Sequence, residues 1–195
     1  MRVARSESDA RSRLQQAALE LFHENGYEQT TAAAIAARAG VTERTFFRHF
    51  PDKREVLFDG EAILRAALLD AIASAPAALG PVDTLFRAFH AVETLLVDNR
   101  PFSKPRHAII GATPALRERE IAKLAALTDA LTAGLQARGV GDLQAVLATQ
   151  AGMAAFVHST LAWLDDPVPG LGARLDAARQ ELTALLGAGA APSAD

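Results

Sequence analysis

The chain has 195 residues, of which half are hydrophobic and 22% are charged, a composition that excludes wholesale disorder and is typical of a globular protein. Cysteine is absent, so disulfides, thiolate metal ligands and cysteine nucleophiles are excluded. The segment from Met1 to Ser12 is polar and charged, which predicts no secretory signal and a cytoplasmic protein. Alanine is the most frequent residue, and because it favours helices over strands we expect an all-α fold.

The net charge of −3 is unevenly distributed along the chain. The segment from Met1 to Glu55 has 9 Lys and Arg against 8 Asp and Glu, whereas the remaining residues have 11 against 15. This asymmetry suggests a small basic module attached to a larger acidic one. The average charge therefore decides nothing about DNA binding, and the local pattern has to be considered instead.

Apolar residues recur at intervals of three and four along the chain, which predicts about nine helices and no strand. Glycines at Gly26 and Gly40 and the proline at Pro51 end helices, and Asp52-Lys53-Arg54-Glu55 is a capping box that opens a long fourth helix. The expected helices lie at about residues 14–25, 31–39, 42–50, 52–72, 81–96, 107–110, 114–138, 143–164 and 171–186. We expect a helix-turn-helix domain at 1–52, an effector and dimerisation domain at 53–186, and a flexible tail at 187–195.

One stretch, from Leu143 to Leu164, has 22 residues without Asp, Glu, Lys or Arg and is long enough to span a membrane. It also contains six polar residues, and acidic residues flank it with no basic cluster on either side. We therefore interpret it as a buried helix, at the centre of a helical domain or at a subunit interface, and we expect no membrane partner.

Residues 31–49 have the spacing of a helix-turn-helix, two short helices joined by a turn that contains glycine. Ala36 and Gly40 are small enough to let the helices cross closely, and Ile35 and Phe46 would be buried between them. The alternative is an ordinary pair of helices with a solvated charged face. Arginine is the commonest reader of guanine, and threonine suits a phosphate or a thymine methyl group. The residues that we expect to contact DNA are Thr31, Thr42, Arg44, Thr45, Phe47, Arg48, His49 and Lys53.

The run from Thr30 to Lys53 resembles the pattern of the tetracycline-repressor (TetR) family of transcriptional regulators. It keeps the spacing of the threonine cap, Ile35-Ala36, Gly40-Val41, the aromatic pair, His49-Phe50 and the closing lysine. With Asn25-Gly26-Tyr27 before it and Leu57-Phe58 after it, the resemblance covers about residues 10–60. It implies a sequence-specific DNA-binding regulator, more a repressor than an activator, and not an enzyme.

The aromatic pair departs from the family pattern at one position. The family usually has tyrosine where this chain has Phe47, and the tyrosine hydroxyl typically contacts a backbone phosphate. Phe47 cannot make that contact, so the resemblance implies that affinity depends more on the threonines, His49 and Lys53. Arg44 occupies a position often filled by a small residue, and it would contact either a base edge or a phosphate.

In the TetR family the last two helices pair with their symmetry mates, which implies a homodimer through helices 143–164 and 171–186. We expect the apolar stripe of the last helix, with Leu175 and Leu182, to face the partner. A two-fold dimer places two recognition helices in successive major grooves. We therefore expect a palindromic operator in double-stranded DNA, with half-sites roughly 34 Å apart.

The C-terminal helices of the family also hold an effector pocket, and here large soft or aromatic side chains lie among alanine-rich helices, which suits a small hydrophobic effector. The segment from Arg100 to Glu120 is similar to the C-terminal domain of mycofactocin-type regulators, which would imply an acyl chain or acyl-CoA. The alternative for each residue is an ordinary place in the core. The expected ligand-binding residues are Phe86, Phe89, His90, Phe102, His107, Met153, Phe156 and Trp163. We expect the fourth helix, starting at Lys53, to transmit the signal.

Motifs for metal binding and catalysis are missing from the sequence. No pair of histidines has metal-ligand spacing, and there is neither a Gly-x-Ser-x-Gly elbow nor a phosphate-binding glycine loop. We therefore expect no metal, no cofactor and no catalytic residue. An all-α enzyme without a recognisable motif, and a DNA-compacting protein without an effector, are the alternative functions.

Overall fold

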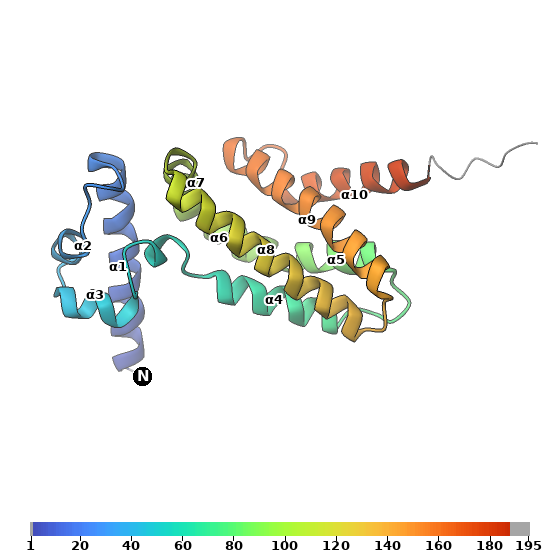
Figure 1. Cartoon of the computed structure of the whole chain (residues 1–195), viewed down its shortest axis with the longest axis horizontal. Helices are drawn as coiled ribbons and strands as arrows, with labels where there is room; N and C mark the ends of the chain where they lie inside the picture. The colour runs from blue at the N-terminus through green and yellow to red at the C-terminus, as the bar shows by residue number, and fades with distance from the viewer. Residues whose placement is uncertain (1, 188–195) are drawn as a thin grey trace, which may run out of the picture. The chain divides into compact units, whose positions relative to one another are not determined.

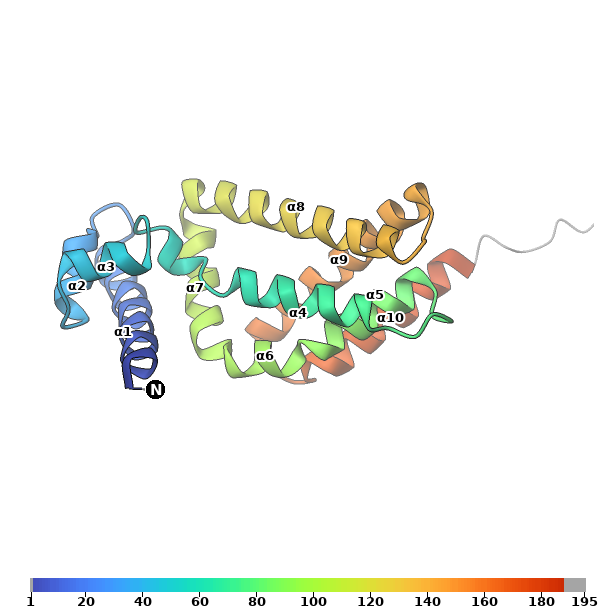
Figure 2. The same cartoon turned by 90° about the horizontal axis from the view of Figure 1, so that it is seen from below.

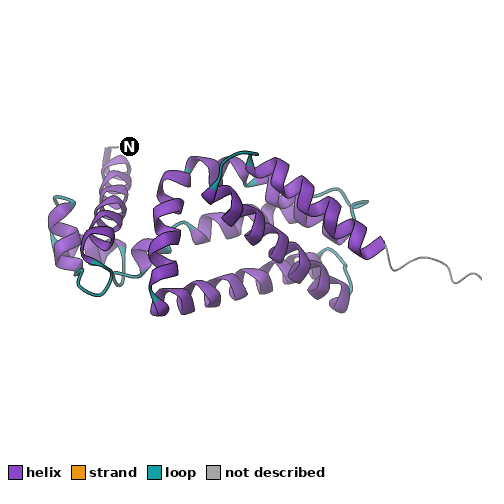
Figure 3. Ribbon diagram, turned by 90° about the horizontal axis from the view of Figure 1, so that it is seen from above, coloured by secondary structure: helices purple, strands orange, loops and turns teal. Residues whose placement is uncertain are grey.

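The computed structural model describes the backbone of residues 2–187 and the side chains of residues 9–185. The described residues form ten α-helices and one short 3₁₀ helix, with no strand among them, so the expected all-α fold is confirmed (Figure 3). In chain order the elements are α1 (Arg2–Asn25), α2 (Ala32–Arg38), α3 (Glu43–His49), η1 (Glu55–Leu57), α4 (Glu61–Ala73), α5 (Pro81–Ala91), α6 (Glu93–Asp98), α7 (Arg100–Ala112), α8 (Pro114–Ala137), α9 (Asp142–Asp165) and α10 (Leu171–Gly187). Apart from Gly187, the tail expected at 187–195 lies outside the described residues.

The segment after Pro51 differs from the expected long helix. Asp52 caps a turn, η1 follows, and α4 begins only at Glu61. Val56 and Leu57 of η1 and Phe58 directly after it are buried in the core of the first unit. Gly60 then adopts a φ of +93°, which a helix does not accommodate. The prediction of a continuous fourth helix starting at Lys53 was therefore wrong.

Two other boundaries also differ from the expected ones. The helix expected at 81–96 is divided at Val92 into α5 and α6, and the short helix expected at 107–110 is part of the longer α7. Pro101 lies in the first turn of α7, where its missing N–H would have no helical acceptor. Pro105 lies inside α7, where it removes one helical hydrogen bond without ending the helix.

The chain forms two compact units. The first contains the described residues up to Glu61 together with Pro101–Ile121, and the second contains Ala62–Arg100 and the described residues from Ala122 onward. A single boundary in the sequence cannot describe these units, because α7 and the first two turns of α8 return to the first one.

The core of the first unit lies between α1, α2 and α3, which pack against one another (Figure 1). Phe22 of α1, Ile35 of α2 and Phe46 of α3 are buried there. Ile110 of α7 and Leu116 of α8 join the same hydrophobic cluster and are also buried. The helix-turn-helix therefore shares its core with a segment that lies about sixty residues further along the chain.

The core of the second unit is built around α5, α9 and α10, and α10 runs alongside α5 (Figure 2). Phe89 of α5 and Phe156 of α9 stack with their ring centroids 4.5 Å apart. Gly152 permits this close approach of α9, because a Cβ atom there would lie 3.1 Å from Cδ1 of Leu85. The helices that the sequence marks as apolar thus pack closely against one another.

The charge-free stretch forms α9, and it is the one described helix that is long and apolar enough to cross a membrane. Nine of its residues are buried, and its main neighbours are α5 and α10. This packing accounts for the buried apolar face of the helix, in agreement with the expected core helix.

Candidate nucleic-acid interface

The helix-turn-helix is shaped by two threonine caps and one glycine. The backbone N–H of Ala34 donates to Oγ1 of Thr31 at 3.1 Å, and that of Thr45 donates to Oγ1 of Thr42 at 3.2 Å, so each threonine satisfies one of the free donors at the start of α2 and α3. Gly40 adopts a φ of +68° in the turn between the helices. The predicted turn and both predicted caps are therefore present.

Helix α3 has one buried face and one exposed face. Phe46 is fully buried, and Phe50, just beyond the end of the helix, is buried beside it. Arg44, Phe47 and Arg48 are exposed, at positions i, i+3 and i+4 of one helical surface. Neither arginine forms an ion pair with any residue that the structure describes. This surface of α3 therefore offers two uncommitted guanidinium groups with an aromatic ring next to them.

The remaining polar residues of this region differ in exposure and in partners. The hydroxyl oxygens of Thr42 and Thr45 lie 3.0 Å apart, so each is bonded to the other at the start of α3. His49 is half-buried, with its ring centroid 6.4 Å from that of Phe50. All eight residues expected to contact DNA lie in the first unit.

Lys53 has a different immediate role from the one expected. Its ammonium group donates to the backbone oxygens of Tyr27, Glu28 and Thr30, at 2.8, 3.3 and 3.0 Å, and lies 4.3 Å from the centre of the Tyr27 ring. An ammonium group has three protons to donate, so these three carbonyls use all of them. Lys53 therefore joins the turn after α3 to the turn between α1 and α2.

Several residues that the sequence analysis did not single out support this unit. Arg38 of α2 bonds to the carboxylates of Glu20 and Glu24 on α1, and this contact holds the pKa of Glu24 below its usual value. Arg106 of α7 forms an ion pair with Glu120 of α8 and also donates to the backbone oxygen of Leu57. These partners are 14 to 49 residues apart, so helical periodicity carries no signal for them.

The comparisons with known proteins agree with this geometry. Residues 14–59 match the family model of bacterial regulatory proteins of the tetR family. Residues 14–59 are therefore similar to the DNA-binding domain of the TetR family. The HTH-type transcriptional regulator TcmR of Streptomyces glaucescens is 43% identical over 82 residues, which are 42% of this chain and 36% of TcmR. The match thus spans about a third of the length of that relative.

The solved structures of TetR-family proteins share the fold of the whole chain. A complex of SmeT with triclosan has a TM-score of 0.65 at 21% identity, and the alignment covers 90% of each chain. NalD, the secondary repressor of the MexAB-OprM multidrug efflux pump in Pseudomonas aeruginosa, has a TM-score of 0.63 at 20% identity over 92% of this chain and 96% of NalD. At this level of identity the likeness concerns the fold alone.

The residues expected to bind an effector are divided between the two units. Five of them are buried in the core of the second unit, and His90 is half-buried there, with Nε2 3.1 Å from Oδ1 of Asp176 on α10. Phe102 and His107 belong to the first unit, where Phe102 packs against the helix-turn-helix core. The five buried residues are Phe86, Phe89, Met153, Phe156 and Trp163.

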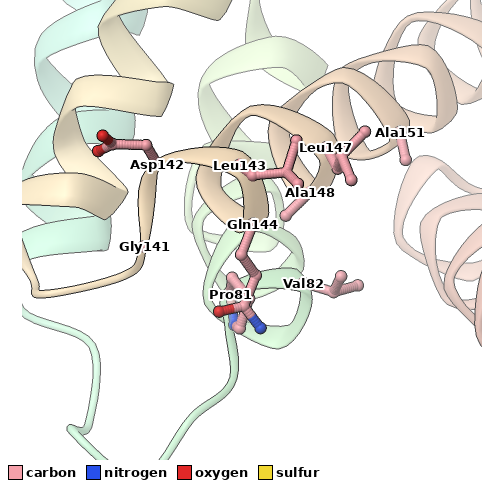
Figure 4. Close-up of a pocket in the computed structure, with 9 residues that line it drawn as sticks. All are labelled: Pro81, Val82, Gly141, Asp142, Leu143, Gln144, Leu147, Ala148 and Ala151. Atoms are coloured by element: carbon pink, nitrogen blue, oxygen red, sulfur yellow. The ribbon is translucent and has the colours of Figure 1, made fainter.

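An apolar hollow with a volume of about 630 Å³ lies on the second unit, between the start of α5 and the first turns of α9 (Figure 4). Pro81 and Val82 line one side of it, and Leu143, Leu147 and Ala148 line the other. None of the residues expected to bind an effector lines this hollow. Leu147 is 60% exposed, so the hollow continues into an exposed apolar surface of α9.

The apolar stripe of α10 faces inward rather than toward a partner. Leu175 is fully buried within the core of its own protomer, and Leu182 is half-buried against the same core. The expectation that Leu175 faces the partner was therefore wrong, whereas that for Leu182 stays a prediction. Among the described side chains of α9 and α10, the exposed large hydrophobic ones are Leu143, Val146, Leu147 and Leu185.

Proposed function

We propose that the chain is a DNA-binding transcriptional repressor that binds a palindromic operator as a homodimer and releases it when a small hydrophobic effector binds. The observation that carries the DNA-binding part is the exposed surface of α3, with two unpaired arginines in a helix-turn-helix of the TetR family. Arginine pairs bidentately with guanine in the major groove, or with phosphate. TcmR is an HTH-type transcriptional regulator and NalD is a repressor, which supports the same activity here.

The proposed dimer rests on α9 and α10, of which α9 has an exposed apolar surface. Leucines as exposed as Leu143 and Leu147, on consecutive turns and next to an apolar hollow, are a costly surface for a monomer in water. An isologous contact between two copies of α9 would bury this surface on both protomers at once. The two-fold axis of such a dimer would be matched by an inverted repeat in the operator.

The proposed effector is a small hydrophobic molecule that binds in the second unit, and an acyl chain is one such class. The aromatic residues of α5 and α9 and the alanine-rich helices around them form an apolar interior. SmeT, which shares the fold, has been solved with triclosan. An effector that binds one conformation of this core more tightly than the other would shift the population between them. Helix α8 begins in the first unit and continues into the second, which suits it to transmit that change.

The DNA-binding part is tested by selecting bound sequences from a random pool of double-stranded DNA with the full chain. We expect an inverted repeat to be enriched. Arg44→Ala and Arg48→Ala should each weaken binding to it, by about 1–3 kcal/mol where the arginine reads guanine. Arg65→Ala is the matched control, because Arg65 is an exposed arginine of α4 without an ion-pair partner among the described residues. Equal binding to all sequences would contradict the proposal and favour a DNA-compacting protein.

The effector part is tested separately, with triclosan and decanoic acid as probes. We expect a probe that binds the second unit to raise the melting temperature of the chain by mass action and to release the selected operator over the same concentration range. Phe89→Trp or Phe156→Trp should abolish both responses while operator binding is kept, because the larger side chain takes up volume beside the stacked rings that the effector would need. Release of DNA without a change in melting temperature would contradict a site in this core.

A further inference from the structure

Helix α3 carries one large apolar side chain that the fold does not bury. Phe47 is 50% exposed, and it is the one large hydrophobic residue with such exposure among the described side chains of α1, α2 and α3. It lies between Arg44 and Arg48 on the exposed surface of the helix. The other aromatic residues of this segment, Phe46 and Phe50, are buried. About half of the Phe47 side chain is therefore free to contact something outside the protomer.

We infer that Phe47 reads a thymine, through contact of its ring with the C5-methyl group in the major groove. This inference rests on the proposed DNA-binding function and adds a specificity-determining residue to it. The methyl group of thymine is the apolar feature of the major-groove edges, and a phenyl ring is among the side chains that contact it.

The surroundings of Phe47 favour a base contact over a phosphate contact. A phenyl ring has no hydrogen-bond donor, so placing it against a phosphate would remove water from the anion without replacing the lost hydrogen bonds. Arg44, three residues before Phe47, and Arg48, directly after it, supply donors for phosphate or guanine on either side. The apolar ring is thus left to meet the apolar part of the base pair between them.

The ring of Phe47 is also held in place before DNA binds. It packs edge-on against Phe46, with centroids 5.3 Å apart and an angle of 85° between the ring planes. Phe46 is fully buried, so it is a fixed support for the exposed ring. A side chain that is already oriented loses little conformational entropy when it contacts its partner, which sharpens discrimination between bases.

The test removes the methyl group from the DNA instead of removing a group from the protein. Each thymine of the selected operator is replaced in turn by deoxyuridine, which keeps every hydrogen-bonding group and lacks the methyl. We expect one position per half-site at which the replacement weakens binding about fourfold, the effect of one methyl group returned to water. The other thymine positions should tolerate the replacement.

The same replacement is then made with Phe47→Ala and Phe47→Leu. Phe47→Ala should bind the thymine operator more weakly and should no longer distinguish thymine from deoxyuridine at that position, because the two changes remove the same contact. Phe47→Leu, which keeps an apolar side chain, should retain part of the discrimination. Since Phe47 is half-exposed, both variants should keep the melting temperature of the parent chain.

Two outcomes would overturn the inference. Either every deoxyuridine replacement is neutral for the parent chain, or Phe47→Ala remains as sensitive as the parent at the responsive position. Both outcomes leave operator binding itself intact, so they are distinguishable from failure of the proposed function, in which no sequence is enriched at all.

Discussion

The ammonium group of Lys53 shows how a single residue can support a binding surface without belonging to it. Its three hydrogen bonds end on carbonyl oxygens of the turn between α1 and α2, where the last helical carbonyls of α1 create a partial negative charge. Contact with a DNA phosphate would require at least one of these bonds to be given up. We therefore expect Lys53 to position α3 relative to α1.

Lys53→Met tests this role through the salt dependence of binding. A residue that neutralises a phosphate changes the slope of log K against log salt by about one, whereas a positioning residue does not. We expect Lys53→Met to lower the melting temperature and the affinity for the operator while the salt slope stays that of the parent. Arg48→Ala is the comparison, with a slope reduced by about one if Arg48 contacts phosphate. A reduced salt slope for Lys53→Met would instead show that Lys53 contacts a phosphate.

Asp52 makes the stability of the first unit dependent on pH. Burial raises the pKa of its carboxyl group, but the hydrogen bonds from the side chain of Arg54 and from the backbone N–H groups of Arg54 and Glu55 outweigh this effect, so the pKa lies below its usual value. Because the pKa is lower in the folded than in the unfolded chain, the contribution to stability is complete above the unfolded value of about 3.9 and is lost as the pH falls through the folded value.

In Asp52→Asn, the free energy of unfolding should therefore depend less on pH in the acid range. We expect the free energy of unfolding, measured by urea titration with circular dichroism at 222 nm, to fall less between pH 5 and pH 3 in this variant than in the parent chain. Asp129→Asn is the matched control, since Asp129 is exposed and has no ion-pair partner among the described residues. An unchanged profile for Asp52→Asn would show that the pKa of Asp52 is the same in the folded and the unfolded chain.

At the scale of secondary-structure elements, Arg138 at the end of α8 fixes the end of α4. Its guanidinium group donates to the backbone oxygens of Ile72 and Ala75 at 2.9 and 2.8 Å, and to those of Ala73 and Pro76 at 3.3 and 2.9 Å. The carbonyls of Ile72 and Pro76 also accept from the backbone N–H groups of Ala75 and Leu79, whereas those of Ala73 and Ala75 receive no such bond in the turn that follows the helix. A cation at this end is also favoured by the helix dipole. One side chain thus joins two helices that are more than sixty residues apart in the sequence.

Substitution of Arg138 should destabilise the second unit, which contains both ends of this contact. Arg138→Met leaves the carbonyls of Ala73 and Ala75 without this donor, and we expect it to lower the free energy of unfolding by about 2 kcal/mol. Trp163 is the single tryptophan of the chain and is buried in this unit, so its fluorescence during urea unfolding reports the change. Arg65→Met, at an exposed arginine of α4, should change the unfolding free energy by less than about 0.5 kcal/mol. Equal effects of the two substitutions would mean that the contact adds nothing.

At the scale of the whole molecule, a test of dimerisation on the last two helices has to substitute a residue that is exposed in the single protomer. Leu147 of α9 is 60% exposed, whereas Leu175 of α10 is fully buried in its own protomer. Aspartate at the buried position would place an unpaired charge in the core and unfold the protomer, whatever its oligomeric state. Aspartate at the exposed position changes only what approaches the surface.

Leu147→Asp should therefore produce a folded monomer. We expect light scattering at micromolar concentration to report the mass of one chain, with the circular dichroism spectrum of the parent retained and operator binding reduced. Leu175→Asp, in contrast, should lose the helical spectrum itself. A Leu147→Asp variant that is still fully dimeric would place the interface away from this surface of α9.

The local signals of the sequence predicted much of the fold and of the candidate interface. The threonine caps at residues 31 and 42, the glycine turn at Gly40 and the buried Phe46 follow from chemistry within a few residues, and each is present in the structure. The long helix expected to begin at Asp52 does not form, and α4 begins only at Glu61. A turn capped by Asp52, the short helix η1 and the positive φ of Gly60 occupy this segment, and the apolar spacing that predicts a helix does not reveal them.

The sequence by itself determined that the chain is all-α and that residues 14–59 carry a helix-turn-helix of the TetR family, because capping, turn formation and amphipathic spacing depend on near neighbours. The tertiary structure decided which of the apolar faces point inward. It turned Leu175 into the core, left Leu147 exposed, brought Ile110 and Leu116 into the core of the helix-turn-helix unit, and placed Lys53 on three carbonyls. These outcomes depend on partners tens of residues apart, and helical periodicity says that a face is apolar without saying which surface will cover it.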